Sequence, residues 1–231
     1  MRANWRQEPC CWWKRVAFYL LGLLLTCLGV AVILQTDWGL DAWNGVFAGL
    51  AACTPLSLGG WSMIVQGSFW VIAALLCRRA QWLCVIPIAL KGLFLDLSKA
   101  AVARWAIPPG FWPGCTCFLL GYLLVALGTG IYVSTGFAKM PIDGLMLALA
   151  ERFCWRVQRA RLTIELCGFA VLLFVQGPFG GGTVLITLTI GQVVAAASTF
   201  SQKWLFAGGC TDTAGSGTRA IEEDIHGDRR I

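Results

Sequence analysis

The sequence predicts an all-α, polytopic membrane protein, a bundle of about six transmembrane helices. Hydrophobic residues make up 58% and charged residues only 13% of the 231 positions, whereas soluble domains contain about 25% charged residues. The mean hydropathy is +0.71, and several apolar runs approach the length of about 20 residues that a helix needs to cross a bilayer. These observations exclude an ordinary soluble fold and make the lipid bilayer the expected partner.

The first apolar run, residues 16–34, follows a basic segment, residues 1–15. This order is also typical of a secretory signal peptide, but such a peptide ends in a small-residue cleavage site. The sequence QTDW at 35–38 offers no such site. We therefore expect a transmembrane helix over 16–34, with residues 1–15 as a cytoplasmic N-terminal segment.

Five further spans are predicted, at 61–76, 83–102, 115–133, 162–175 and 183–200. Two additional segments, 41–52 and 141–151, are too short to cross a hydrocarbon core about 30 Å thick. We expect them to be short re-entrant or interfacial helices. After the last span, residues 208–231 are polar and lack apolar periodicity, which predicts a disordered cytoplasmic tail over 204–231.

The positions of the basic residues predict the orientation of these spans. Cytoplasmic connections of membrane proteins are enriched in Lys and Arg. A cytoplasmic N-terminus places Arg78, Arg79, Lys203 and the basic cluster within 139–161 on one side. The opposite side receives the connections at 53–60 and 177–182, which carry no basic residue, and the loop that holds Arg104. We expect a plasma-membrane protein with both termini in the cytoplasm. The +6 net charge thus reflects topology, and no nucleic-acid partner is expected.

The two halves of the chain align with each other at a displacement of about 99 residues. Gly45 then meets Gly144, and Gly92 meets Gly191. Basic residues change sides between the halves, as they must when each half has an odd number of spans. We interpret residues 16–104 and 115–203 as two inverted three-span repeats, each with a short extra helix, an arrangement of many secondary transporters. Chance similarity between two Leu-rich segments is the alternative.

Small residues and cysteines suggest packing rather than chemistry. Gly22 and Gly29, and likewise Gly121 and Gly128, lie two helical turns apart, which favours close helix crossings. Most of the 11 cysteines lie inside apolar runs and are interpreted as reduced, packed side chains. Because the single histidine, His226, lies in the tail, we expect no zinc site, no cofactor and no enzymatic activity.

The second half carries the sharpest motif, Pro141-Ile142-Asp143-Gly144-Leu145-Met146, followed by Glu165 and a glycine-rich turn at 180–182. In these residues the chain resembles the YczE/YyaS/YitT group of bacterial integral membrane proteins. The resemblance implies a membrane fold and location, and no particular substrate. The first half departs from the group's pattern, with Ala42-Trp43-Asn44 in place of Pro-Trp-Asp and 82–84 in place of a Gly-Thr pair.

Two symmetry-related residues, Asp143 and Asn44, open the short segments. Each could cap a helix N-terminus, because Asp and Asn side chains accept hydrogen bonds from unpaired backbone amides. Alternatively, an anionic group at a broken membrane segment could bind a coupling cation or a basic group of a solute. Both residues are therefore candidates for ion or substrate binding.

Four more polar residues lie within predicted spans. Glu165 and its repeat counterpart Gln66 could approach each other at the repeat interface, or Glu165 could pair with Arg161 at the membrane surface. Lys91 and Asp96 lie in the third span. Asp96 could pair with Lys99 or take part in a proton relay, whereas Lys91 needs a partner on another helix.

Two functions fit these features. The first is a secondary transporter, permease or exporter of a small solute, which the inverted charge pattern and the symmetry-related polar residues favour. The second is an accessory or scaffold protein that supports another membrane-associated system, in which the polar residues serve packing alone.

Overall fold

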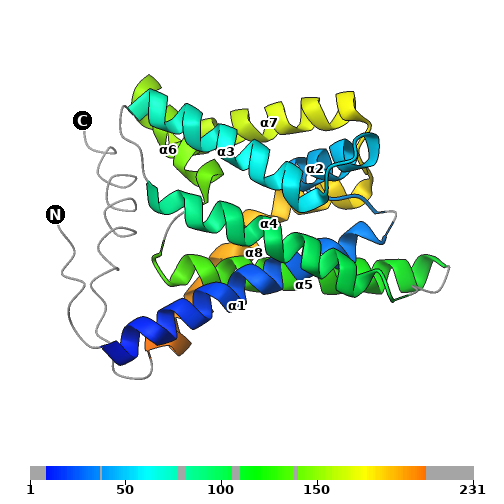
Figure 1. Ribbon diagram of the computed structural model, residues 1–231, viewed down its shortest axis with the longest axis horizontal. Helices are drawn as coiled ribbons and strands as arrows, with labels where there is room; N and C mark the ends of the chain where they lie inside the picture. The colour runs from blue at the N-terminus through cyan, green and yellow to red at the C-terminus, as the bar shows by residue number, and fades with distance from the viewer. Residues whose placement is uncertain (1–8, 37, 78–81, 106–109, 138–139, 207–231) are drawn as a thin grey trace, which may run out of the picture.

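The computed structural model describes residues 9–36, 38–77, 82–105, 110–137 and 140–206. This part of the chain contains only helices, in agreement with the all-α prediction (Figure 1). Arg78, Arg79, Lys139 and residues 207–231 lie outside the described residues. In chain order the elements are α1 (Pro9–Leu34), α2 (Ala42–Cys53), α3 (Leu58–Cys77), η1 (Trp82–Cys84), α4 (Val85–Val102), α5 (Phe111–Ser134), α6 (Pro141–Phe153), α7 (Val157–Val175) and α8 (Gly181–Phe206).

Each predicted span corresponds to a helix, and the two short segments form α2 and α6. The largest boundary differences lie at the two outer ends of the helical part. α1 begins at Pro9, within the predicted N-terminal segment, and α8 continues through Phe206, past the predicted start of the tail. Lys14 and Arg15 in α1, and Gln202 and Lys203 in α8, interrupt the apolar runs without ending the helices, so a search for apolar runs stops before the helix does.

Four helices are long and apolar enough to cross a membrane, over Trp13–Leu34, Leu58–Cys77, Phe111–Ser134 and Gly181–Ser201. The remaining predicted spans, α4 and α7, are of similar length, but each carries three ionisable residues within it. The exposed surface is strongly apolar, since Phe174 and Leu188 are 90% and 73% exposed. The described chain is therefore a membrane protein with four apolar candidate spans, and the count of six stays a prediction.

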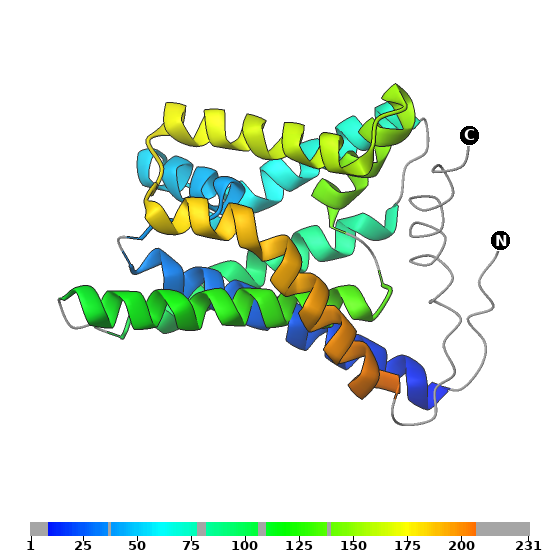
Figure 2. The same cartoon turned by 180° about the vertical axis from the view of Figure 1, so that it is seen from behind.

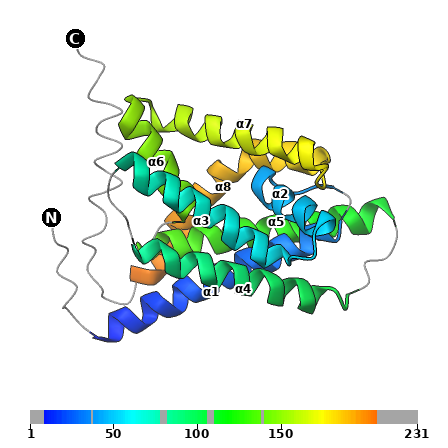
Figure 3. The ribbon, with the colours of Figure 1, turned by 45° about the horizontal axis from the view of Figure 1, so that its top comes forward.

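Helices α1 and α5 lie side by side along the length of the molecule (Figures 1 and 3). α4 packs against α1 as α8 packs against α5, while α3 contacts α6 and α2 contacts α7. The start of α1 and the end of α8 lie on the same side of the molecule (Figure 2). The short helices lie at opposite ends, with α2 near the end of α1 and α6 near the end of α5 (Figure 1).

A glycine seam, formed by Gly22, Gly29, Gly121 and Gly128, joins α1 to α5. A Cβ atom on Gly29 would lie 2.6 Å from the carbonyl oxygen of Gly121, and one on Gly22 would lie 2.8 Å from that of Gly128. Since real Cβ atoms do not approach backbone so closely, only glycine permits this crossing. The sequence prediction of close helix-crossing surfaces is confirmed.

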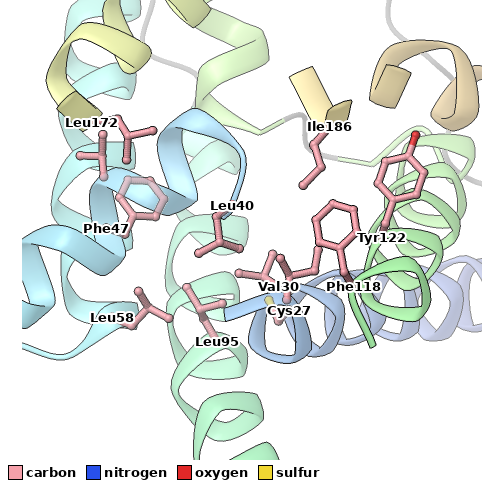
Figure 4. Close-up of a cluster of buried hydrophobic side chains, with 12 residues drawn as sticks. Cys27, Val30, Leu40, Phe47, Leu58, Leu95, Phe118, Tyr122, Leu172 and Ile186 are labelled. Carbon is pink, nitrogen blue, oxygen red and sulfur yellow. The ribbon is translucent and has the colours of Figure 1, made fainter. Parts of the chain in front are cut away.

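The largest buried cluster lies where both halves meet (Figure 4). Phe47 of α2 lies near Leu172 of α7, and Leu40 lies between them and the α1 residues. Among the cysteines, Cys27 and Cys84 are buried as predicted, whereas Cys77 and Cys167 are exposed. The interpretation of the cysteines as packed side chains is therefore wrong for the latter two, which lie on outward faces of α3 and α7.

Candidate functional site

A cavity of about 190 Å³ lies among α5, α6, α7 and α8. Three ionisable side chains line it: Asp143 from α6, and Arg161 and Glu165 from α7. Thr129 and Tyr132 of α5 add hydroxyl groups. The other lining residues are apolar or glycine: Val133, Ile142, Met146, Ile164, Ile190, Gly191 and Val194. Two of the six candidates from the sequence, Asp143 and Glu165, thus share one cavity.

The start of α6 positions Asp143. Pro141 occupies the first turn of α6, where its missing N–H costs no hydrogen bond. The residue at the N-cap is Met140, whose side chain makes no capping hydrogen bond. Asp143 lies within the first turn, and its amide donates to the Met140 carbonyl at 3.0 Å. Met140, and not Asp143, is therefore the N-cap residue, and the Asp143 side chain lines the cavity.

Arg161 and Glu165 lie four residues apart on α7 and share a helix face. The charged neighbours that act on Glu165 are Asp41, Arg161 and Asp143. Arg161 thus acts electrostatically on Glu165, in keeping with the pairing considered from the sequence. Both side chains also line the cavity.

The start of α2 is built differently, because Asp41 caps it. The Asp41 carboxylate accepts a hydrogen bond from the Asn44 amide at 3.3 Å and two from Nδ2 of Asn44, at 2.8 and 3.1 Å. Asp41 is thus the N-cap residue of α2, and Asn44 is hydrogen-bonded to it. Sequence reasoning missed Asp41, although Asp three residues before Asn at the start of an apolar run is a recognisable capping signal.

Gln66 and Lys91 lie outside the cavity. Gln66 is 3% exposed on α3 and is not among the residues that line the cavity with Glu165. The Lys91 ammonium lies 5.9 Å from the centre of the Phe47 ring of α2, within the range of a cation–π interaction. Lys91 therefore contacts another helix, as the sequence required, through an aromatic face.

Asp96 holds α3 to α4. Its carboxylate accepts hydrogen bonds from the Ser57 hydroxyl at 2.6 Å and from the Gly59 amide at 2.7 Å. Both donors belong to the start of α3, whose first amides would otherwise lack partners. The predicted pairing of Asp96 with Lys99 is wrong, because the carboxylate faces α3. The Ser57 hydroxyl also accepts a hydrogen bond from the Gly60 amide at 3.0 Å. Nothing in the sequence around Ser57 indicated that it binds Asp96.

The cavity has a counterpart position in the first half of the chain. Helices α2 and α6 start 99 positions apart, and so do α3 and α7. At this spacing Asn44, Ser62 and Gln66 correspond to the ionisable residues of the cavity, Asp143, Arg161 and Glu165. α3 packs closely on α4, whereas α7 and α8 make no comparable contact among the described residues.

Sequence comparison identifies the family. A family of unknown function, DUF6198, matches residues 13–199, which include every helix of the structure in whole or in part. The chain belongs to the DUF6198 family. The match spans both halves, the glycine seam and all residues that line the cavity.

Relatives of this DUF6198 protein have no assigned activity in their names. It is 27% identical to the uncharacterized protein YyaS of Bacillus subtilis over 77% of this chain and 88% of the relative. It is 28% identical to the uncharacterized membrane protein YczE of the same organism, over 78% and 83%. An uncharacterized protein of Haemophilus influenzae is 28% identical over 79% and 82%. The resemblance predicted from the sequence is confirmed, and no solved structure matches the chain.

The donor set of this DUF6198 protein determines which ligands its cavity can hold. Among the residues that the structure describes, His, Cys, Asp and Glu form no group of three that could hold a metal ion. The cavity instead combines two carboxyl groups, one guanidinium, two hydroxyls and apolar walls. Such a lining binds small organic molecules through a few polar contacts on an apolar surface.

Proposed function

We propose that this DUF6198 protein is a secondary transporter of a small solute, a permease or exporter in the plasma membrane. The observation that carries the proposal is the cavity among α5 to α8, lined by Asp143, Arg161 and Glu165. Ionisable residues within membrane helices are costly, and they mark substrate or ion pathways in many membrane proteins. A protein that served packing alone would have no need of three such groups around one cavity.

The arrangement of the helices supports two inverted repeats. α1 and α5 run in opposite directions along each other, and α2 and α6 lie at opposite ends of the molecule (Figure 1). Inverted repeats place solute and ion sites near the bilayer midplane, often where membrane helices are broken into shorter pieces. α6 is such a short piece, and its first turn supplies Asp143 to the cavity.

The charges of the cavity indicate the kind of solute. Two carboxyl groups face one guanidinium in its lining, and Asp41 adds a further negative neighbour of Glu165. A solute with an amino group and an apolar body fits this lining best, because the carboxylates attract the amine and the apolar walls cover the rest. An additional carboxylate on the solute would find Arg161.

Direct tests are binding and flux with purified protein. Small amines, amino acids and quaternary ammonium compounds are screened by thermal shift and then by uptake into proteoliposomes. We expect Asp143→Asn and Glu165→Gln each to reduce flux at least about tenfold, since each removes a charged contact. Lys99→Gln is the matched control, because Lys99 is exposed on α4, away from the cavity.

Several outcomes would contradict the proposal. Absence of flux and of binding across all three classes would overturn transport. Normal cellular activity of the doubly neutral variant at normal expression would favour the alternative, an accessory or scaffold protein, in which Asp143 and Glu165 serve packing.

Reporter fusions test the topology. We expect fusions after Gly59 and Gly181 to report the outside and fusions after Arg79 and Arg156 to report the cytoplasm, because basic residues stay inside. A reversed result at either pair would exclude the six-span inverted arrangement.

A further inference from the structure

The first half of the chain contains a closed equivalent of the cavity. The residues 99 positions before the cavity-lining Thr129, Tyr132, Met146 and Val194 are Val30, Ile33, Phe47 and Leu95. All four of these earlier residues belong to the main buried cluster (Figure 4 labels Val30, Phe47 and Leu95). Where the second half has a cavity, the first half has packed side chains.

Three polar residues of the first half are buried as well. Asn44, Ser62 and Gln66 are 8%, 1% and 3% exposed, respectively. The Asn44 Oδ1, Ser62 Oγ and Gln66 Oε1 atoms are buried and have no hydrogen-bond partner. Buried polar atoms in native proteins are almost always paired. Three such atoms at the positions equivalent to Asp143, Arg161 and Glu165 therefore require an explanation.

The contact between α3 and α4 covers the face of α3 that carries Ser62 and Gln66, which follow Gly59 by three and seven residues. A Cβ atom on Gly59 would collide with the Gly92 carbonyl oxygen, so the two helices touch backbone to backbone. At the same end of α3, Asp96 binds Ser57 and the Gly59 amide. The residue equivalent to Asp96 on α8 is Ala195, which has no carboxylate to hold α7.

We propose that Asn44, Ser62 and Gln66 form a second, outward-facing solute site that is closed in this structure, and that Asp96 is its latch. The site opens when α3 separates from α4, and the cavity between α7 and α8 closes in the same step. This inference rests on the proposed transport function. The unpaired amide and hydroxyl oxygens are the acceptors that a solute amine meets when it leaves the carboxylates of the open cavity.

The latch lies on the side away from the start of α1 and the end of α8. α3 begins at Leu58, on the side of the molecule opposite the start of α1 (Figures 1 and 3). With the N-terminus in the cytoplasm, the Asp96 contacts close the external side. The structure then represents an inward-facing state, in which α3 and α4 are in contact while a cavity separates α7 from α8. Such a difference between two equivalent halves is what alternating access requires.

Thiol labelling measures this exchange without a substrate. Ser62→Cys reports the closed site with almost no change of volume, and Val194→Cys reports the open cavity. Each cysteine variant is prepared in the full chain, reconstituted in nanodiscs and labelled with a polar maleimide. Mass spectrometry of the peptide that contains the new cysteine gives its labelling rate separately from those of the native cysteines. The latch is removed with Asp96→Ala, and Lys99→Ala is the matched control on the same helix.

We expect Asp96→Ala to raise the labelling rate at position 62 about fivefold and to lower the rate at position 194, since losing a helix cap shifts a two-state equilibrium by this order. Lys99→Ala should change neither rate. Ser57→Ala removes the hydroxyl that binds Asp96 Oδ2 but keeps the Gly59 contact. It should give a smaller change in the same direction, and it replaces Asp96→Ala if that variant does not fold.

Labelling and flux separate the two proposals. An unchanged rate at position 62 in folded Asp96→Ala and Ser57→Ala would overturn the latch, and so would a rise at both reporter positions. If those variants leave labelling unchanged while the protein still transports, the closed site is wrong and transport stands. Reciprocal labelling in a protein that neither binds nor moves any screened solute supports the two packings and overturns transport.

Discussion

Two helix pairs at equivalent places in the chain behave differently. α3 and α4 touch through Gly59 and Gly92, with Asp96 binding the start of α3. α7 and α8 are separated by a cavity, although Gly191 stands at the position equivalent to Gly92. At the position of Gly59, α7 has Gln158, which has a side chain. Gly191 alone therefore does not bring α8 into close contact with α7, because α7 lacks a glycine equivalent to Gly59 and α8 lacks a carboxylate equivalent to Asp96.

Exchanging the polar residues of the two regions should have the largest effect. Gln66→Glu places a carboxyl group at a position that is 3% exposed. We expect a loss of about 3–5 kcal/mol in stability, because an uncompensated buried charge costs this much, and a fall of about 10 °C in the melting temperature. The reverse change at the equivalent position, Glu165→Gln, should lower the melting temperature by less than about 2 °C, because the Glu165 side chain borders a cavity.

Thermal unfolding of both variants in the same detergent measures this contrast. Equal losses at positions 66 and 165 would mean that the two regions are equally enclosed, which would remove the basis for distinguishing them.

Gly92 and Gly191 should show the same difference between the two helix pairs at a smaller scale. A Cβ atom on Gly92 would lie 2.9 Å from the Gly59 carbonyl oxygen, whereas one on Gly191 would lie 3.4 Å from an Arg161 nitrogen at the end of a flexible side chain. Gly92→Ala should cost about 1–3 kcal/mol by forcing the helices apart, and Gly191→Ala should be neutral or slightly stabilising. Denaturation of each variant by heat, with Gly144→Ala as an open-space control, tests this difference.

The smallest effect is expected at Ser62. Its hydroxyl oxygen is buried without a partner, so Ser62→Ala should raise stability by up to about 1 kcal/mol, since it removes an unsatisfied group. The same substitution at Ser134, whose hydroxyl donates to the Ile131 carbonyl at 2.7 Å, should be neutral or destabilising. A lower melting temperature for Ser62→Ala would show that its hydroxyl has a partner in the membrane-embedded protein.

Much of the fold could be predicted from the sequence, because membrane helices follow from apolar length alone. The two short helices and the glycine seam were also predictable, the first from insufficient length and the second from spacing. The start of α1 and the end of α8 could not be predicted, because Lys14 and Arg15 in α1, and Gln202 and Lys203 in α8, interrupt the apolar runs while the helices continue.

The site was predicted less completely. Asp143 and Glu165 could be identified because charges inside apolar helices are rare, and the structure places them in one cavity. The partners of Asp96 could not be identified from the sequence. Ser57 and Gly59 lie 39 and 37 residues away from it in sequence, and only the packing of α3 on α4 brings them together. The burial of Gln66 likewise depends on contacts that local sequence does not encode.

The glycine seam between α1 and α5 has a consequence for genetics. Those two helices belong to different halves of the chain and meet through backbone contacts that any side chain would obstruct. Inactivating missense changes from an unbiased screen should therefore accumulate at Gly22, Gly29, Gly121 and Gly128, none of which carries a functional group. Second-site suppressors should arise on the facing helix, where a large side chain such as Ile33 or Val125 can shrink to admit the new methyl group.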